Sequence, residues 1–337
     1  FKQMKRFLNV FLLAVILPAF VITGCKDDDN PQPQPKGTYA TLSQYMTDNG
    51  LDLPDLLTTP SSWVIAPTLI DGKGGIVDPN DYSIPNYHVL DIRSSDDFTS
   101  GHIKGAMHTS LGDIITKAKE VGTDKPILVV CYTGQTAARA VMALRLSGFP
   151  DAQVMKFGMS YWNEVFDKWT PNISDQAVGD PNWVTDASGS LPSNDYPDWE
   201  SNTTDGEDLL AERVNSMLSK DWTIKSDVVL GDPAGYDIYN FWTNEDYTTF
   251  GHYKGAYQYK PISIANDILK ALPQSDECLI YCYTGQTSSF IAAWLQVLGY
   301  NAKSILFGVN SLSHTALSDA GKPAWHHSND YDYETSK

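Results

Sequence analysis

The chain has 337 residues, of which 42% are hydrophobic and 19% charged. This length exceeds what one hydrophobic core usually holds, so two domains are expected. The formal net charge of −17 argues against a nucleic-acid partner and against electrostatic docking onto anionic lipid.

The N-terminal residues predict a targeting signal rather than a folded domain. A basic start is followed by an apolar run over 7–22 and by small residues before Cys25, the order typical of a secretory signal over 1–24. A membrane anchor is the alternative, although the run is short for a spanning helix. The ending Val-Ile-Thr-Gly-Cys resembles a bacterial lipoprotein signal, which implies cleavage before Cys25 and a lipid on that residue.

Residues 25–37 begin with an acidic run and continue with alternating Pro and Gln. Such a segment cannot build a core and is expected to be an extended tether. The acidic run resembles the surface-export signal of Bacteroidota lipoproteins, but a solvated linker has the same composition. We therefore expect a cell-envelope protein that is held at the outer membrane by its lipid alone. Whether it is displayed on the cell surface is left open.

Strand and helix patterns alternate through the next part of the chain. Apolar runs bounded by polar turns predict strands, and apolar residues at helical spacing predict helices. Strands are expected at 63–65, 87–93, 127–131 and 154–157, and helices at 38–49, 112–119, 137–149 and 161–169. This alternation predicts a parallel sheet covered by helices on both faces.

The second part of the chain repeats the first. Residues 171–205 are rich in Pro, Asn, Asp and Ser and are expected to be a linker, with Trp183 and Trp199 pinned to a surface. Beyond it, Gly-His-x-Lys-Gly-Ala recurs, so that His102 corresponds to His252 at an offset of 150. A repeat of this length indicates a duplicated domain.

The repeated stretch that carries chemistry is Cys-Tyr-Thr-Gly-Gln-Thr, which follows an apolar strand and precedes a helix in both halves. Its cysteines are Cys131 and Cys282. Backbone N–H groups in such a loop, with the positive end of the following helix, stabilise a thiolate or a persulfide. The predicted catalytic residues are Cys131 and Cys282, and the predicted loop residues are Tyr132, Thr133, Gly134, Gln135, Thr136, Ala137, Tyr283, Thr284, Gly285, Gln286, Thr287 and Ser288.

Individual loop positions suggest specific roles. Gly134 and Gly285 allow the backbone to curl around the sulfur. Thr136 and Thr287 are N-cap candidates, and the tyrosines after each cysteine are expected to line the pocket. The other two cysteines do not complete a disulfide or metal pattern, since Cys278 and Cys282 would lie roughly 13 Å apart on one strand. No metal or cofactor is expected.

The order Asp-x-Arg, Gly-His-Ile-Lys-Gly-Ala, then a strand entering a Cys-x-x-Gly-x-Thr loop and a helix resembles the rhodanese family. The resemblance implies two tandem rhodanese-like domains, each a five-stranded parallel sheet with helices on both faces. It also implies a nucleophilic cysteine that carries sulfur as a persulfide. The predicted divisions are 38–170 for the first domain with its N-terminal helix, 206–330 for the second, and 331–337 for a tail.

The same resemblance assigns His102 and His252 to a structural turn, and Asp91 and Arg93 to the scaffold, with Arg93 expected to pair with Asp97. The second half departs from this pattern, because Asn240 and Trp242 occupy the positions that correspond to Asp91 and Arg93. Both cysteines are nevertheless present, so we expect two competent sites, the first closer to the family pattern.

Three functions can be weighed at this point. A cysteine phosphatase needs an Arg six residues after the cysteine, where this chain has Ala137 and Ser288. Rhodaneses that use thiosulfate well tend to carry basic residues in this loop, and these loops have no Lys or Arg. The resemblance therefore implies a persulfide or polysulfide donor rather than thiosulfate, with a thiol or cyanide as acceptor, unless Lys104, Arg139 or Lys156 approaches the loop in the folded chain. A non-catalytic binding or sensor lipoprotein is the alternative to a sulfurtransferase. The oligomeric state is left open.

Overall fold

Two parallel sheets form the framework of the computed structural model, which describes residues 37–336. The first has the order β1-β5-β4-β2-β3 and comprises β1 (Val64–Ile65), β2 (His88–Asp91), β3 (Met107–His108), β4 (Ile127–Val130) and β5 (Gln153–Met155). The second has the equivalent order β10-β8-β11-β12-β7 and comprises β7 (Thr223–Ile224), β8 (Asp237–Asn240), β10 (Tyr257–Gln258), β11 (Glu277–Tyr281) and β12 (Asn301–Ile305). All pairs within both sheets are parallel, which confirms the predicted fold.

Helices cover both faces of each sheet. The first half contains α1 (Thr38–Asp48), α2 (Leu53–Thr58), α3 (Ser95–Ser100), α4 (Ile114–Val121), α5 (Gln135–Leu146) and α6 (Met159–Trp162). The second contains α7 (Gly206–Ser219), α8 (Ser226–Gly231), α9 (Asn244–Phe250), α10 (Gln286–Val297) and α11 (His314–Asp319). Single 3-10 turns occupy Glu164–Phe166, Thr170–Asn172, Pro233–Gly235, Asp267–Ala271 and Gly308–Ser311.

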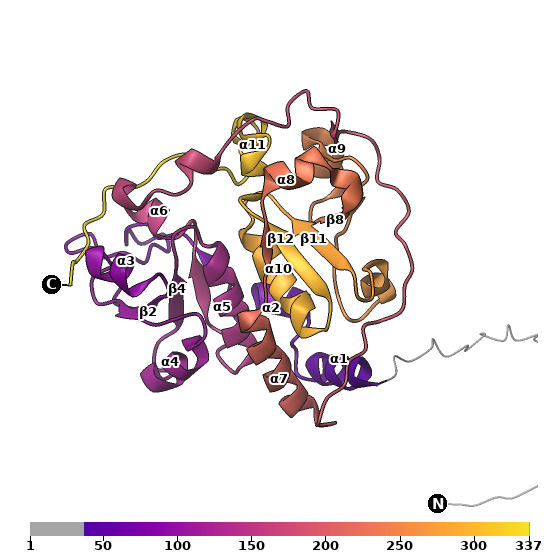
Figure 1. Cartoon of the computed structure of the whole chain (residues 1–337). Coiled ribbons are helices and arrows are strands. Elements are labelled where there is room, and N and C mark those ends of the chain that lie inside the picture. Colours follow the sequence, from indigo (N-terminus) through magenta and orange to yellow (C-terminus); the bar gives the residue numbers. More distant parts are fainter. Residues whose placement is uncertain (1–36, 337) are drawn as a thin grey trace, which may run out of the picture. The chain divides into compact units, whose positions relative to one another are not determined.

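The alternation of side chains along the central strands divides the core into layers. In β4, Ile127 and Val129 face a large apolar cluster that includes α5, α7 and α10, whereas Leu128 and Val130 face a separate cluster around Trp162. The large cluster contains buried residues of both halves, and α5 and α10 pack together between the two sheets (Figure 1). The halves therefore share one core instead of meeting at a thin interface.

Segments at the ends of the described chain cross between the halves. Tyr39 of α1 stacks on Tyr196 with ring centroids 4.5 Å apart and meets Tyr300 edge-on. At the other end, Glu334 and His102 exchange two backbone hydrogen bonds of 2.9 Å, and the C-terminal segment runs back to the first half (Figure 1). The domain divisions stay predictions, but the contacts of the predicted tail lie on the first half.

The predicted linker is pinned to the second half. Strand β6 (Trp183–Val184) pairs antiparallel with β9 (His252–Tyr253), and Arg213 packs 4.7 Å from the ring centroid of Trp199. Ser188 accepts a hydrogen bond from the backbone N–H of Gln258 in edge strand β10. This contact blunts an otherwise open edge of the sheet.

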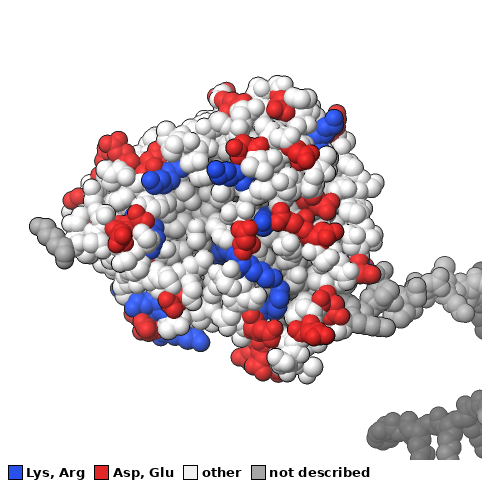
Figure 2. Space-filling model, viewed as in Figure 1, with Lys and Arg blue, Asp and Glu red and all other residues white. Residues whose placement is uncertain are grey.

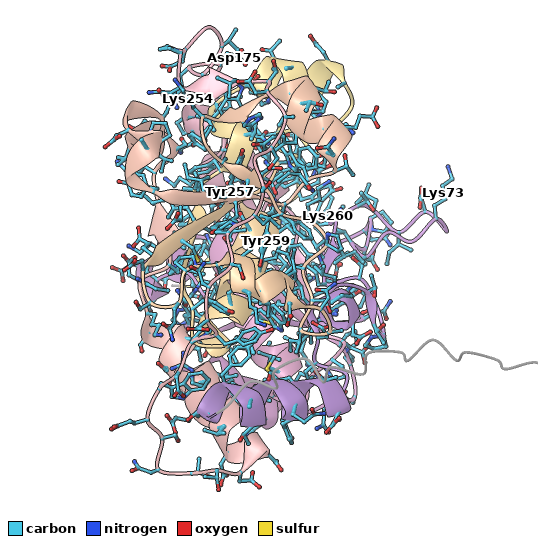
Figure 3. All side chains as sticks on the ribbon, turned by 90° about the vertical axis from the view of Figure 1, so that its right-hand side faces the viewer. Lys73, Asp175, Lys254, Tyr257, Tyr259 and Lys260 are labelled. Carbon is cyan, nitrogen blue, oxygen red and sulfur yellow. The ribbon has the colours of Figure 1, made fainter. Side chains whose placement is uncertain are left out.

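The same edge carries a cluster of aromatic side chains, and Figure 3 labels two of them, Tyr257 and Tyr259. Tyr257 and Tyr259 both pack on Tyr239, at 5.5 and 5.0 Å between ring centroids, and Lys260 lies over the ring of Phe241. Lys73 projects from a separate exposed loop (Figure 3). On the face in Figure 2, acidic side chains are widely spread and basic ones form smaller groups among them.

Two helix predictions were too long or of the wrong type. The helix expected over 161–169 breaks after α6, because the backbone of Asn163 is extended and bridges to Asp330 of the C-terminal segment. The second-half counterpart of the helix at 112–119 is only a 3-10 turn over Asp267–Ala271. The predicted signal over 1–24, Cys25 and the tether up to residue 36 lie outside the described residues.

Candidate functional site

The first cysteine lies directly after β4, at the carboxyl end of the first sheet. Gly134 adopts a left-handed conformation (φ 80°) at the N-cap of α5, and its N–H lies 3.1 Å from Cys131 Sγ. The N–H of Ala137 lies 3.4 Å from the same sulfur. The loop therefore points backbone donors at the thiol, as the sequence predicts.

The second cysteine has an equivalent loop, with one backbone N–H donor and additional hydroxyl groups at its sulfur. Gly285 has φ 75° at the N-cap of α10, and Cys282 Sγ lies 3.4 Å from the N–H and 3.5 Å from Oγ of Ser288. Ser288 Oγ lies 2.8 Å from Ser304 Oγ. The second sulfur is thus backed by a buried hydroxyl network.

Burial opposes ionisation of the first cysteine. Cys131 is only 4% exposed, and this desolvation raises the pKa of its thiol, with a further contribution from the charge of Asp91. The backbone N–H groups of Ala137, Thr133 and Gly134 lower the pKa but do not compensate. The N–H groups of the loop thus favour the thiolate, as the sequence predicts, but burial outweighs their effect at Cys131.

The two cysteine loops contact each other reciprocally. Oε1 of Gln135 accepts a hydrogen bond of 2.8 Å from the backbone N–H of Phe307, and Oε1 of Gln286 accepts one of 3.0 Å from that of Phe157. Phe157 and Phe307 both have positive φ, 62° and 59°, a strained conformation for a bulky residue. Each glutamine thus holds the strained turn beside the other half's loop.

Glycine is required where these glutamines arrive. A Cβ on Gly134 would lie 2.4 Å from Oε1 of Gln286, and a Cβ on Gly285 would lie 2.3 Å from Oε1 of Gln135. The two glycines therefore permit both the left-handed turn and the close approach of the opposite loop.

Aromatic side chains close the space between the loops. Trp169 lies edge-on to Phe157 and to Phe307, with ring centroids 5.0 Å away in both cases. Its Nε1 donates to the carbonyl of Thr133 at 3.3 Å, and Trp325 stacks beside it. One tryptophan from between the halves therefore contacts equivalent residues of both sites.

Some predicted loop residues have other roles than expected. Tyr132 donates to Asp97 at 2.7 Å and Tyr283 donates to Asp246, so both hydroxyls tether the loop to its own half. Thr136 and Thr287 are not N-caps, because Gly134 and Gly285 hold those positions without a side-chain cap. Thr284 caps the backbone N–H of Gln286 at 3.3 Å.

The scaffold beneath the two sites differs as the sequence indicates, except for the partner of Arg93. Arg93 binds Asp91 with Nη2 and Oδ2 2.6 Å apart, and both side chains are almost fully buried. The predicted pairing of Arg93 with Asp97 is therefore wrong. Asn240 ends β8 where Asp91 ends β2, so the second half replaces a buried ion pair with neutral groups.

The repeated histidines belong to the fold. Nδ1 of His102 lies 2.8 Å from the carbonyl of Phe98, and Nδ1 of His252 lies 3.1 Å from that of Tyr247. Each ring also stacks on the same partner's ring. Neither contact involves a cysteine.

The three basic residues considered from the sequence have different positions. Lys104 pairs with Asp81 on the surface, and the buried Arg139 donates to Gln296 and to the carbonyl of Met217. Only Lys156, which directly follows β5, borders a pocket next to the loops. Within residues 37–336, no group of His, Cys, Asp or Glu is placed to hold a metal ion, and no helix has the length and apolarity needed to cross a membrane.

Sequence reasoning missed the two glutamine contacts, Trp169 and Ser304. The conserved spacing of Phe157-Gly158 and Phe307-Gly308 within the repeat was a usable signal for the strained turns. The partner of each turn lies more than a hundred residues away, so no local pattern could identify it.

Comparisons with known proteins identify one family. Residues 80–165, which include the first cysteine loop, match the family described as Rhodanese-like domain. The thiosulfate sulfurtransferase GlpE of Shewanella oneidensis is 33% identical over 76 residues, covering 23% of this chain and 75% of that protein. The uncharacterized protein YqhL of Bacillus subtilis is 31% identical over 74 residues, covering 22% of this chain and 59% of that protein.

Solved structures include a rhodanese-related protein from Thermoplasma volcanium, 28% identical with a TM-score of 0.21, which matches 23% of this chain and 75% of that one. A thiosulfate sulfurtransferase from Pseudomonas aeruginosa is 14% identical with a TM-score of 0.25, and the match covers 72% of this chain and 42% of that one.

Proposed function

Because this chain belongs to the rhodanese family, we propose that it is a sulfurtransferase that carries sulfane sulfur as persulfides on Cys131 and Cys282. The observation that carries the proposal is that backbone N–H groups face both sulfurs, two at 3.1 and 3.4 Å from Cys131 Sγ and one at 3.4 Å from Cys282 Sγ. Such donors stabilise the anionic sulfur of both a thiolate and a persulfide.

The transfer proceeds in two balanced steps. The cysteine thiolate attacks the sulfane sulfur of the donor, and the donor's sulfur bond breaks with its electron pair leaving on sulfite, for thiosulfate, or on a thiolate, for an organic persulfide. A thiolate or cyanide acceptor then attacks the terminal sulfur of the cysteine persulfide and releases the cysteine thiolate. No external oxidant or reductant is consumed.

Cysteine variants test the proposal. Sulfur transfer from thiosulfate and from glutathione persulfide is measured for Cys131→Ser, Cys282→Ser and the double variant, with Cys278→Ala as the control for a buried cysteine outside the loops. We expect the double variant to lose turnover and the purified protein to show a one-sulfur mass increase that cyanide removes. Full turnover by the double variant would rule out an enzymatic role for these loops.

A non-catalytic binding module is the second candidate, favoured by one observation. Both sulfurs are nearly inaccessible, with Cys131 4% and Cys282 2% exposed, and a donor must displace part of the aromatic cover to reach them. The same assay separates the two functions, because a binding module would turn over no donor while keeping its fold.

Lipid anchoring at the cell envelope also belongs to the proposal. It is supported by the apolar run and the Val-Ile-Thr-Gly-Cys ending before residue 26. We expect Cys25→Ala to abolish incorporation of labelled fatty acid in cells, with Cys278→Ala as the control. Continued labelling of Cys25→Ala would contradict the anchor.

A further inference from the structure

A basic pocket lies beside the two cysteine loops. Its volume is about 310 Å³, and it forms between the turn after β5 and the segment after α11, which crosses toward the first half (Figure 1). The side chains that matter here are Lys156, Phe157, Tyr161, Lys322, His326 and His327. No acidic residue lines the pocket, in a chain with a net charge of −17.

The charge balance of the lining favours an anion. Lys322 is neutralised by Asp246, at 2.7 Å, but Lys156 forms no ion pair with any residue of the described chain. Its ammonium lies 5.1 Å from the ring centroid of Phe157, and burial lowers its pKa. A bound anion would compensate this loss of solvation.

Both walls of the pocket are bonded to the cysteine loops. On the first-half side, Phe157 donates its N–H to Gln286 of the second loop, and the N–H of Met159 donates to the carbonyl of Cys131 at 2.8 Å. On the other side, Nδ2 of Asn310 donates to the carbonyls of Tyr283, at 2.7 Å, and Pro323, at 3.1 Å. A ligand in the pocket would therefore contact the two segments, around Phe157 and Pro323, that are hydrogen-bonded to the cysteine loops directly or through Asn310.

We propose that this pocket binds the anionic group of the sulfur donor and supplies the basic residues that the cysteine loops themselves lack. The shared chemistry is an oxyanion in the same molecule as the sulfane sulfur, either the sulfonate of thiosulfate or a carboxylate of a low-mass thiol persulfide. The pocket lies at the carboxyl end of the first parallel sheet, where ligands of such sheets commonly bind. The identity of the ligand rests on the proposed function.

The test compares charged with uncharged donors. The variants are Lys156→Gln and the pair His326→Gln with His327→Gln, whose histidines are exposed and should not disturb folding, and the control is Lys117→Gln on the distant α4. We expect KM for thiosulfate or for glutathione persulfide to rise about tenfold in Lys156→Gln, the cost of one charge-assisted hydrogen bond. KM for the persulfide of 2-mercaptoethanol, which carries no oxyanion, should not change.

The two anionic donors form separate arms. A rise confined to thiosulfate identifies an inorganic donor, and a rise confined to glutathione persulfide identifies an organic one. Equal effects on charged and uncharged donors, or no effect on either anion, would overturn the pocket assignment.

A binding measurement separates failure of the pocket from failure of the enzyme. Titration calorimetry of thiosulfate, and separately of glutathione persulfide, into Cys131→Ser, Cys282→Ser protein needs no turnover. We expect saturable binding of at least one of them that Lys156→Gln weakens and Lys117→Gln leaves intact. Absence of binding by both, or binding insensitive to Lys156→Gln, would overturn the inference even if sulfur transfer itself were established.

Discussion

The two cysteine sites share a backbone and differ in what surrounds it. Beneath the first loop lies the buried Asp91–Arg93 ion pair, and the residue that meets its sulfur six positions after the cysteine is Ala137, which has no hydroxyl group. The second has neutral Asn240 beneath it, and behind its sulfur are Ser288 and Ser304. The first loop thus has a buried ion pair next to it, whereas the sulfur of the second loop has hydroxyl groups next to it. The cradle of N–H groups tolerates either arrangement because main-chain atoms form it.

The largest expected effect comes from breaking the ion pair of the first half. Asp91→Asn leaves the buried guanidinium of Arg93 without its countercharge, which should lower the free energy of unfolding by about 3–5 kcal/mol. Chemical denaturation followed by tryptophan fluorescence measures this change. The matched change in the second half, Asn240→Leu, leaves no charge unpaired and should cost no more than about 1 kcal/mol. Equal losses of unfolding free energy in the two variants would mean that the ion pair gives the first half no special dependence on charge.

Gln135 and Gln286 connect the two cysteine sites, because each accepts a hydrogen bond from a backbone N–H of the other half. Gln135→Leu and Gln286→Leu each leave a backbone N–H without its acceptor, which should cost about 1–3 kcal/mol. Gln286 holds the Phe157 turn, which belongs to the aromatic cover of the first site. Its loss should loosen that cover and speed alkylation of Cys131 more than that of Cys282, and Gln135→Leu should do the reverse. Site-resolved mass spectrometry reads both rates in one sample. If each variant affected only the cysteine of its own half, the coupling between loops would be refuted; Gln274→Leu, at an exposed position, is the control.

Burial of Cys131 predicts its pH dependence. The thiolate is the nucleophile, and a raised pKa means that its fraction is small at neutral pH and grows about tenfold per pH unit until that pKa is reached. Alkylation of Cys131 should therefore keep rising above the pH at which an unfolded thiol levels off. Since the folded pKa is the higher one, this group contributes stability below the unfolded pKa and loses it as pH rises through the folded value. A rate that levels off at or below the pH of a free thiol would contradict the burial effect.

The smallest effect concerns the hydroxyl network. Ser288→Ala places at position 288 the residue found at the matching position 137 of the first site, and it should slow alkylation of Cys282 about threefold, in line with the modest net contribution of one hydrogen bond. The reciprocal Ala137→Ser should accelerate Cys131 if the new hydroxyl reaches the sulfur. Ser318→Ala, on α11 and away from both sulfurs, controls for the loss of a hydroxyl. Unchanged rates in both variants would show that the N–H groups alone set the reactivity.

The sequence alone determined most of the strands and helices, the parallel arrangement of the strands and the duplicated loop, because each depends on local patterns. Apolar runs of strand length, Gly at the turn after each cysteine and the repeat itself are readable without contacts. The replacement of Asp91 and Arg93 by Asn240 and Trp242 was also visible by alignment of the halves. The partner of Arg93 was not, since Asp91 and Asp97 both lie within four residues of it and only the folded structure selects between them.

What the tertiary structure decided is how the halves meet. Gln135 and Gln286 are polar loop residues in the sequence, and only the packing of α5 against α10 brings each to a backbone N–H of the other half. The raised pKa of Cys131 likewise depends on desolvation by residues from several segments. Lys156 and the segment after α11 form a pocket for the same reason. Local patterns specify backbone geometry, but burial and long-range contacts exist only once the chain has closed on itself.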